Sequence, residues 1–439
     1  MVHRVLIALA LALGVLASCY EAGHYRCAHD EQCIYSGAQG RCESIGYCSY
    51  GRDTCESGRV WGPYAGDGLA GDCLVSPDDG GATADGDEPD VAACEGWIPG
   101  EWRRRIPLQL VADERFADLA DFPALVVLDP QRIDYDHAGR DGGDLQFADA
   151  DGNPLPHEID RWSSGDLSHV WVRLDRYAPA DGPIYLYYDR PASSGDANAT
   201  APDVWRAGFA SVWHLGNELA DASGHDRALA ANPTVAVSGT IGESSRFEAD
   251  DDEGPRITAA ERTGDLGSPF ADETTVTMWV RALSGGTDFA AGTLFDASMV
   301  GAGVGGITAT ISEDLELCLV RGYNGIAEWC TMEDIVPAAA SWHHLAIVMQ
   351  TQPASVALYV DGMQRSTGTF GSADGLPAPV DTLPLYLGND GSTFSPYAGD
   401  LDEVRLAGVK RSPAWIAAEF AAGTDALFEY GEEEHCQPQ

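Results

Sequence analysis

Between Trp97 and the C-terminus, apolar and polar residues alternate over short stretches that end at turns rich in glycine, proline and aspartate. Residues 170–174 (VWVRL) and 184–188 (IYLYY) are examples, and the turn sequence PADGP at 179–183 separates them. Alternation with a period of two places every second side chain on the same face of a strand. The sequence therefore predicts an all-β protein, and its 50 glycines and 24 prolines favour short strands joined by turns over long helices.

The length of 439 residues suggests two or three folded domains. We expect a disulfide-rich segment at 19–73, an acidic linker at 74–93, a β-sandwich of about seven strands at 94–190, a second linker at 191–204, a larger β-sandwich at 205–430 and a tail at 431–439. The linker at 74–93 has no large apolar residue from Ser76 to Pro89, so it is predicted to be a solvated tether.

The charge balance excludes several classes of function. The chain has 69 acidic and 26 basic residues, which gives a formal charge of −43. A surface this anionic repels phosphate, so nucleic acid is not an expected partner. Lys410 is the only lysine, and no phosphate-binding loop of the G-x-x-x-x-G-K-[ST] type can form around it, so we expect no nucleotide either.

The N-terminus has the features of an export signal. Arg4 precedes an apolar run at 5–16, which is too short to span a bilayer, and the run leads into Leu-Ala-Ser-Cys at 16–19. This sequence resembles a bacterial lipobox, which implies a signal peptide at 1–18 and a diacylglycerol group on Cys19. Tyr20 in place of an aspartate implies the outer membrane, with the lipid as the only membrane contact. The alternative is an ordinary signal peptide with an unrelated cysteine.

Ten cysteines remain after Cys19, an even number that suits an exported chain with disulfides. Six of them lie within 47 residues that are rich in glycine: Cys27, Cys33, Cys42, Cys48, Cys55 and Cys73. Three disulfides are predicted to replace the core that this segment is too short to build, with the pairing left open. A zinc site is the alternative, although the spacing lacks paired C-x-x-C motifs.

The other four cysteines suggest specific pairs. Cys318 and Cys330 flank a Tyr-Asn-Gly turn at 323–325, so they are predicted to face each other across a β-hairpin. Cys94 precedes the first predicted sandwich and Cys436 follows the second. We expect these two cysteines to join and to tie the end of the chain to the linker.

The two predicted sandwiches resemble known families. Residues 102–106 (WRRRI), 122–126 (FPALV), 144–147 (DLQF), 156–159 (PHEI) and 170–172 (VWV) resemble a domain of unknown function from bacterial envelope proteins. Residues 212–216 (VWHLG), 219–224 (LADASG), 275–280 (TVTMWV), 341–346 (SWHHLA), 358–362 (LYVDG), 385–388 (LYLG) and 399–405 (GDLDEVR) resemble the laminin-G-like jellyroll of the concanavalin A-like lectin and glucanase superfamily. This resemblance implies a jellyroll with one short helix near its end, at 412–420.

Several residues of the predicted jellyroll allow more than one interpretation. Trp279 and Trp342 are predicted to fill the sandwich interior. His343 and His344 are strand neighbours and must point to opposite faces, so they cannot chelate one ion together. The segment from Glu248 to Glu253 matches the E-x-D-x-x-E motif of glucanases by letter, but Gly-Pro follows at once and the intervening residues are not apolar, which favours a surface turn.

The resemblance also implies calcium, which superfamily members often bind at the edge of the sandwich. Asp221 in the LADASG loop and Asp402 in the GDLDEVR strand are the positions that it names as ligands. The alternative roles are a turn-capping aspartate and a buried carboxylate that accepts hydrogen bonds from backbone amides.

The sequence as a whole predicts a non-catalytic lipoprotein of the cell envelope that binds carbohydrate or protein through its jellyroll. Two alternatives remain: a glycan hydrolase on the same jellyroll, and an envelope scaffold that binds no small ligand. Loop shape decides binding in this fold, so the ligand itself cannot be deduced from sequence.

Overall fold

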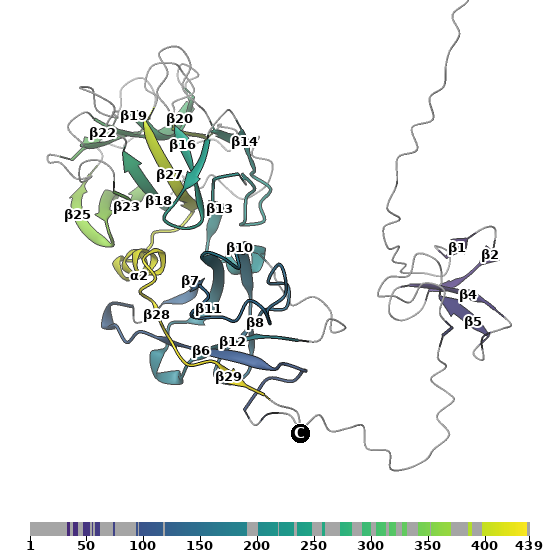
Figure 1. Cartoon of the computed structure of the whole chain (residues 1–439). Coiled ribbons are helices and arrows are strands. Elements are labelled where there is room, and N and C mark those ends of the chain that lie inside the picture. The colour runs from purple at the N-terminus through teal and green to yellow at the C-terminus, as the bar shows by residue number, and fades with distance from the viewer. Residues whose placement is uncertain are drawn as a thin grey trace, which may run out of the picture. The chain divides into compact units, whose positions relative to one another are not determined.

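The computed structural model divides the chain into two compact units, Met1–Asp90 and Val91–Gln439 (Figure 1). The residues that it describes are 33–35, 38–42, 47–52, 55, 58–61, 73–74, 94, 96–116, 119–190, 201–217, 219–231, 235–247, 257–259, 273–282, 292–299, 304–312, 316–321, 327–331, 341–351, 353–369, 385–388 and 397–436. The predicted signal peptide, Cys19, Cys27, the tether beyond Leu74 and the Glu248–Glu253 motif lie outside these residues. No helix in the described part of the chain is long and apolar enough to cross a membrane.

Disulfides form the core of the N-terminal unit. Its strands are β1 (Ile34–Tyr35), β2 (Ala38–Gln39), β3 (Arg41–Cys42), β4 (Cys48–Gly51) and β5 (Arg59–Trp61), arranged as the pair β1-β2 and the sheet β3-β4-β5. Disulfides join Cys33 to Cys48 and Cys55 to Cys73, and Cys42 is also disulfide-bonded. The buried half-cystines stand where a larger domain would place apolar side chains, as the prediction of disulfides requires.

The first sandwich of the second unit spans the predicted domain. Its strands are β6 (Arg104–Leu110), β7 (Ala120–Leu128), β8 (Gln146–Ala148), β9 (Pro154–Leu155), β10 (His157–Arg161), β11 (Ser168–Arg176) and β12 (Ile184–Tyr188). Short 3-10 helices lie at η2 (Glu114–Phe116) and η3 (Pro179–Asp181). One sheet has the order β10-β11-β7 and the other includes β6-β12-β8-β9. These seven described strands confirm the expected sandwich, whose core includes Ile106, Phe147, Val126 and Val172.

The end of the chain belongs to this first sandwich, which corrects the predicted boundaries. Strands β28 (Phe428–Tyr430) and β29 (Glu434–His435) pair antiparallel with β6, so 428–435 is neither jellyroll nor free tail. Ion pairs to Arg104 and Arg105 hold Glu433 and Glu434 beside β6. The predicted disulfide between Cys94 and Cys436 is present and closes this arrangement.

The jellyroll consists of two antiparallel sheets. The sheet with the order β15-β16-β27-β18-β23-β24-β25 contains β15 (Val235–Ser238), β16 (Glu243–Phe247), β27 (Gly399–Ala407), β18 (Glu273–Ala282), β23 (His343–Thr351), β24 (Ala354–Val360) and β25 (Met363–Gly368), and β13 (Phe209–Trp213) also pairs with β27. The facing sheet, β14-β17-β26-β19-β20-β21-β22, contains β14 (Leu229–Ala231), β17 (Ile257–Ala259), β26 (Tyr386–Leu387), β19 (Gly292–Met299), β20 (Val304–Ile311), β21 (Leu317–Arg321) and β22 (Ala327–Cys330).

Two turn predictions for the jellyroll are confirmed. Cys318 and Cys330 are direct partners across β21 and β22 and form a disulfide. Between β24 and β25, Asp361 and Gly362 both adopt positive φ, 51° and 73°, which is the backbone that a two-residue Asp-Gly hairpin turn requires. The strands on either side therefore keep the register that the turn sets.

The positions of the two jellyroll tryptophans correct a prediction. Met278 and Val280 on β18 pack inside the jellyroll, so alternation puts Trp279 on the outer face of the sheet. Helix α2 (Pro413–Gly423) covers it there, with the rings of Trp279 and Phe420 5.8 Å apart. Trp342 is half-buried just before β23, with Arg281 stacked on its ring.

Helix α2 lies between the two sandwiches (Figure 1). It begins as predicted, with the Ser412 side chain accepting a hydrogen bond from the amide of Trp415 and proline at the next position. Trp415 packs edge-on against Phe122 of β7, while Phe420 faces the jellyroll. The second predicted linker likewise ends inside the fold, because it includes the short helix α1 (Ala201–Val204), whose Val204 is fully buried.

Candidate functional site between the two sandwiches

Asp221, one of the two predicted calcium ligands, organises a turn. Its Oδ1 accepts hydrogen bonds from the amides of Val212 and Ser223, both at 3.0 Å, and from the Ser223 hydroxyl at 2.6 Å. Its Oδ2 accepts one from the amide of Arg227 at 3.2 Å. This is the turn-capping role that the sequence left open as the alternative to calcium.

Asp402, the other predicted ligand, lies on β27 and is fully buried. Its Oδ2 accepts hydrogen bonds from the amides of Thr240 at 2.7 Å and Ile241 at 3.0 Å. Burial, together with the nearby charge of Glu403, raises the pKa of Asp402 well above its usual range. The structure gives no contact between Asp221 and Asp402 among the residues it describes, so calcium at these two positions stays a prediction.

His214 joins the two sandwiches electrostatically. It follows β13 of the jellyroll, and its Nδ1 lies 2.7 Å from Glu403 Oε1 on β27 and 3.9 Å from Asp160 Oδ1 on β10. Its Nε2 lies 3.5 Å from Oε2 of Glu158, also on β10. Burial alone would lower the pKa of His214, but the three carboxylates outweigh it and raise this pKa well above its usual value. The imidazole is therefore held as a cation between two domains.

Arg405 supplies the second buried cation at this junction. Its guanidinium lies 2.6 Å from Glu403 and 2.9 Å from Glu419 of α2. It also stacks on Trp171 of β11 and on Trp205, with its Cζ 4.3 Å and 4.9 Å from the ring centroids. The charges of β27 therefore face the first sandwich and helix α2, and not the solvent.

The backbone of β27 is strained at the centre of the cluster. Glu403 adopts a φ of +51°, and the pairing of β27 with β18 shifts register between Thr277 and Trp279 at this point. A non-glycine residue with a positive φ destabilises the fold by roughly 1 kcal/mol or more, and the ion pairs of the Glu403 carboxylate offset this strain. Burial would raise the pKa of Glu403, but His214 and Arg405 lower it.

Sequence reasoning missed this cluster as a site, although its signal was visible. The strand 401–406 carries three charged residues among apolar ones, and charged side chains are seldom fully buried without partners. The partners come from segments up to 245 positions away, between Glu158 and Glu403, so no local pattern indicates which charges meet. We name Glu158, Asp160, His214, Glu403 and Arg405 the junction cluster.

The described residues contain two groups whose donor atoms lie close enough together to hold a metal ion. One is Cys318, Glu328 and Cys330, but its cysteines are joined in a disulfide and cannot act as thiolate ligands. The other is Asp160, His214 and Glu403 of the junction cluster, whose donor atoms lie within 4.8 Å of one another. His343 and His344 do point apart, as predicted: His344 is buried beside Trp279, and His343 bonds Asp361 at 2.8 Å.

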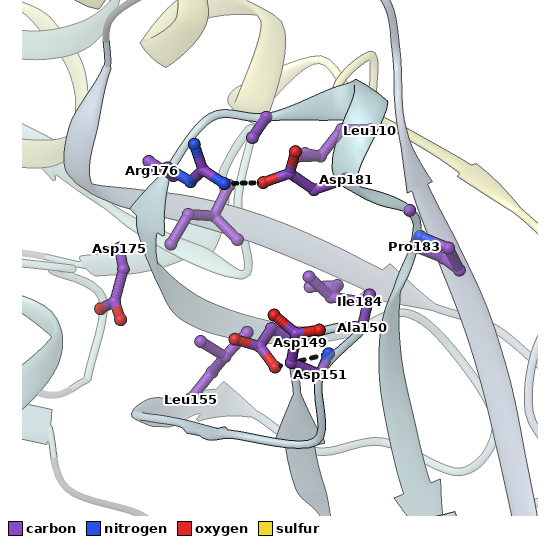
Figure 2. A pocket seen from close by; sticks show the side chains of 13 residues that line it. Leu110, Asp149, Ala150, Asp151, Leu155, Asp175, Arg176, Asp181, Pro183 and Ile184 are labelled. Carbon is purple, nitrogen blue, oxygen red and sulfur yellow. Dashed lines mark hydrogen bonds and ion pairs between the residues drawn. The ribbon is translucent and has the colours of Figure 1, made fainter. Parts of the chain in front are cut away.

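A groove of about 540 Å³ lies on the first sandwich (Figure 2). Leu110, Leu155 and Ile184 provide buried apolar surface, and aspartates surround it. Asp149 shapes the rim by accepting hydrogen bonds from the amides of Asp151 and Asn153, and Asp181 pairs with Arg176. The volume lies within the range of small-ligand sites, and the rim offers acceptors for hydroxyl groups.

Two families match separate parts of the chain. Residues 253–417 match the family described as Concanavalin A-like lectin/glucanases superfamily, a laminin-G-type domain. Residues 141–205 match the family described as Domain of unknown function (DUF2341). The junction cluster therefore takes Glu158 and Asp160 from the second match and Glu403 and Arg405 from the first.

Among solved structures, the chain is similar to receptor-binding domains of clostridial toxins. The binding domain of Botulinum neurotoxin DC, in complexes titled with SialylT and with rat synaptotagmin II, is 11% identical, with a TM-score of 0.41, over 49% of this chain and 52% of that chain. The binding domain of Paraclostridial Mosquitocidal Protein 1 is 14% identical, with a TM-score of 0.40, over 51% and 53%. This chain thus spans about half the length of those domains. No curated protein matches it.

Proposed function

We propose that the protein is a non-catalytic lipoprotein of the bacterial cell envelope that binds carbohydrate or protein through its jellyroll. The observation that carries the proposal is the two-sheet jellyroll, of which residues 253–417 match a superfamily that includes lectins. In such a sandwich the strands bury one another's faces, and binding falls to the loops that connect them. Calcium at Asp221 or Asp402 is part of this proposal as an aid to loop order.

The proposed anchor is a diacylglycerol group on Cys19, placed at the outer membrane. The acidic, proline-containing tether from 74 to 93 would separate the anchored end from the folded head. Replacement of Cys19 by alanine tests the anchor, because the variant should leave the membrane fraction and lose metabolic labelling with palmitate. A variant that keeps both would show that another segment attaches the protein.

The binding experiment uses the mature chain made soluble by Cys19→Ser. It is applied to a glycan array and to a pull-down from envelope extract, each with and without EDTA. The proposal predicts a saturable glycan or protein ligand, and a loss of binding in EDTA that added Ca²⁺, but not Zn²⁺, reverses would support the calcium component. No detectable binding in either assay would contradict the proposal and favour the scaffold hypothesis.

A variant of the groove on the first sandwich locates the binding site. Asp151→Asn with Asp175→Asn removes two rim charges of this groove (Figure 2) without touching the jellyroll. Binding through the jellyroll predicts unchanged affinity in this double variant. A loss of binding would transfer the site to the first sandwich and refute the assignment to the jellyroll.

The proposed lack of catalysis has its own test. Any glycan that binds is incubated with the protein and analysed for shorter products. Products that disappear in Glu248→Gln with Glu253→Gln would establish the hydrolase hypothesis in place of the proposal, because these residues match the glucanase motif. A bound glycan that remains intact supports a binding role.

A further inference from the structure

Three segments bring metal-binding side chains to one point between the sandwiches. Glu158 and Asp160 project from β10 of the first sandwich, His214 follows β13, and Glu403 lies on β27. Donor atoms of Asp160, His214 and Glu403 all lie within 4.8 Å of one another. The imidazole is central, at 2.7 Å from Glu403, 3.5 Å from Glu158 and 3.9 Å from Asp160.

The cluster concentrates negative charge in a nearly dry environment. The side chains of His214, Glu158, Asp160 and Glu403 are only 13%, 13%, 12% and 1% exposed. Arg405 takes one oxygen of Glu403, Trp205 Nε1 donates a hydrogen bond to Glu158, and the imidazole of His214 lies near all three carboxylates. Buried carboxylates are costly unless cations compensate them, so this site favours an additional positive charge.

A second observation comes from Asp402, which is fully buried and precedes Glu403 on β27. Its Oδ1 has no hydrogen-bond partner in the part of the chain that the structure describes. Its Oδ2 accepts hydrogen bonds from the amides of Thr240 and Ile241. The next residue, Gly242, lies against Asp160, because a Cβ on this glycine would be 3.3 Å from Oδ2 of Asp160. Asp402 is therefore next to Glu403 on β27, and the loop that it binds lies against Asp160.

We propose that Asp160, His214 and Glu403 bind one divalent transition-metal ion of the Zn²⁺ type, with Glu158 remaining beside the other nitrogen of the imidazole. One imidazole nitrogen with carboxylate oxygens is a donor set typical of zinc, whereas calcium prefers oxygen ligands alone. Ligand atoms at tetrahedral zinc lie about 3.3 Å apart, a value derived from bonds of about 2.0 Å. The observed separations of 2.7 Å and 3.9 Å lie on either side of it, so small side-chain movements suffice.

The ion would enter from the partly exposed side of the cluster, where His214, Glu158 and Asp160 retain their 12–13% exposure. It would replace the imidazole proton as the charge that compensates the carboxylates, and Arg405 would keep the second oxygen of Glu403 in place. Because Asp160 belongs to the first sandwich and His214 and Glu403 belong to the jellyroll, bound metal would strengthen the junction between the domains.

The experiment uses untagged Cys19→Ser protein and Zn²⁺ as the probe. Stoichiometry is measured by mass spectrometry of the metal after gel filtration, affinity by competition with a chromophoric chelator, and stability by thermal unfolding with Zn²⁺ or Ca²⁺. We expect one Zn²⁺ per chain and a rise in Tm with Zn²⁺ that Ca²⁺ does not reproduce.

Variants assign the site. His214→Gln and Asp160→Asn should each lower Zn²⁺ affinity at least about tenfold. Even the substitution of a residue that only supports a metal ligand lowers metal affinity by about that factor. His435→Gln and Asp166→Asn are the matched controls, because their side chains are 52% and 63% exposed and lie outside the cluster. Both controls should bind Zn²⁺ as the parent protein does.

Three results would overturn the proposal: no Zn²⁺ bound by the parent protein, Zn²⁺ affinity unchanged in both cluster variants, or Ca²⁺ that displaces Zn²⁺ at equal concentration. The first would leave the cluster as an ion-pair network held by a protonated imidazole. If His214→Gln fails to fold, Asp160→Asn decides the assignment, with anomalous diffraction at the zinc edge as the independent measurement.

Discussion

Arg405 of the jellyroll stacks on Trp171 of the first sandwich, with its guanidinium carbon 4.3 Å from the centroid of the indole ring. Both residues are almost completely buried, although they belong to different domains. Arg405 lies on β27, next to the strained Glu403, and Trp171 lies in the middle of β11. The face of the jellyroll that carries its most charged strand is therefore an internal surface of the whole head, the unit Val91–Gln439.

Replacing Arg405 with methionine should destabilise the head strongly. The variant leaves the buried Glu403 and Glu419 without their shared guanidinium partner, which costs about 3–5 kcal/mol in comparable buried ion pairs. Urea unfolding followed by tryptophan fluorescence measures the change. Arg115→Met is the matched control, because its ion pair with Asp113 is at the surface and should contribute little to stability. Equal losses in the two variants would show that burial of the pair is irrelevant.

Buried His169 should contribute a loss of stability of the head in mild acid. Burial lowers the pKa of His169 to about 4, below the value of about 6.5 expected in the unfolded chain. Its contribution is fully present above pH 6.5 and is lost as pH falls towards 4, because the unfolded state then binds the proton first. From pH 7.5 to pH 5 the loss amounts to about 2 kcal/mol.

The test for this histidine compares His169→Gln with the exposed His137→Gln. Unfolding free energies are measured at pH 7.5 and pH 5 for both variants and for the parent protein. His169→Gln should reduce the difference in unfolding free energy between the two pH values more than His137→Gln does. An unchanged pH dependence in His169→Gln would mean that other groups account for the acid sensitivity.

The two disulfides of the head should differ in their effect on stability. Cys94 and Cys436 are 342 positions apart, whereas Cys318 and Cys330 are 12 apart and lie on paired strands. Loop-closure entropy alone predicts that replacing the long-range pair with serine costs about 3 kcal/mol more than replacing the hairpin pair. Thermal and urea unfolding of the two double variants measure this difference. A larger loss in the hairpin variant would contradict the entropic explanation.

Gly362 is predicted to resist substitution. Its φ of +73° disfavours side chains, and a Cβ would lie 3.2 Å from Ala417 of helix α2. Gly362→Ala should therefore lower stability by about 1 kcal/mol or more. Gly51→Ala, which has space around its Cα and no positive φ, is the control in the other unit and should change little.

The sequence predicted what depends on local pattern. Alternation identified the strands of both sandwiches, Asp361-Gly362 identified a hairpin turn, and Ser412-Pro413 identified the start of α2. Each of these signals acts within a few residues of the chain, so no knowledge of distant segments was needed.

Among the predictions that depended on distant partners, the disulfide between Cys94 and Cys436 is confirmed, but others were wrong. Trp279 was placed inside the jellyroll because a large aromatic residue needs cover, but helix α2 provides that cover on the other face. The pairing of β28 with β6 joins residues more than 300 positions apart, and nothing near Phe428 indicates it. The junction cluster was missed for the same reason, because only the folded chain brings His214 close to its carboxylates.

We infer that the two sandwiches form one cooperative body around the buried junction. Equilibrium urea unfolding of the Cys19→Ser protein tests this most directly when it is followed by tryptophan fluorescence and by far-ultraviolet circular dichroism. We predict that the head unfolds in one transition with coincident curves, and that Arg405→Met shifts both curves together. Two separated transitions, with only one of them sensitive to Arg405→Met, would contradict the claim.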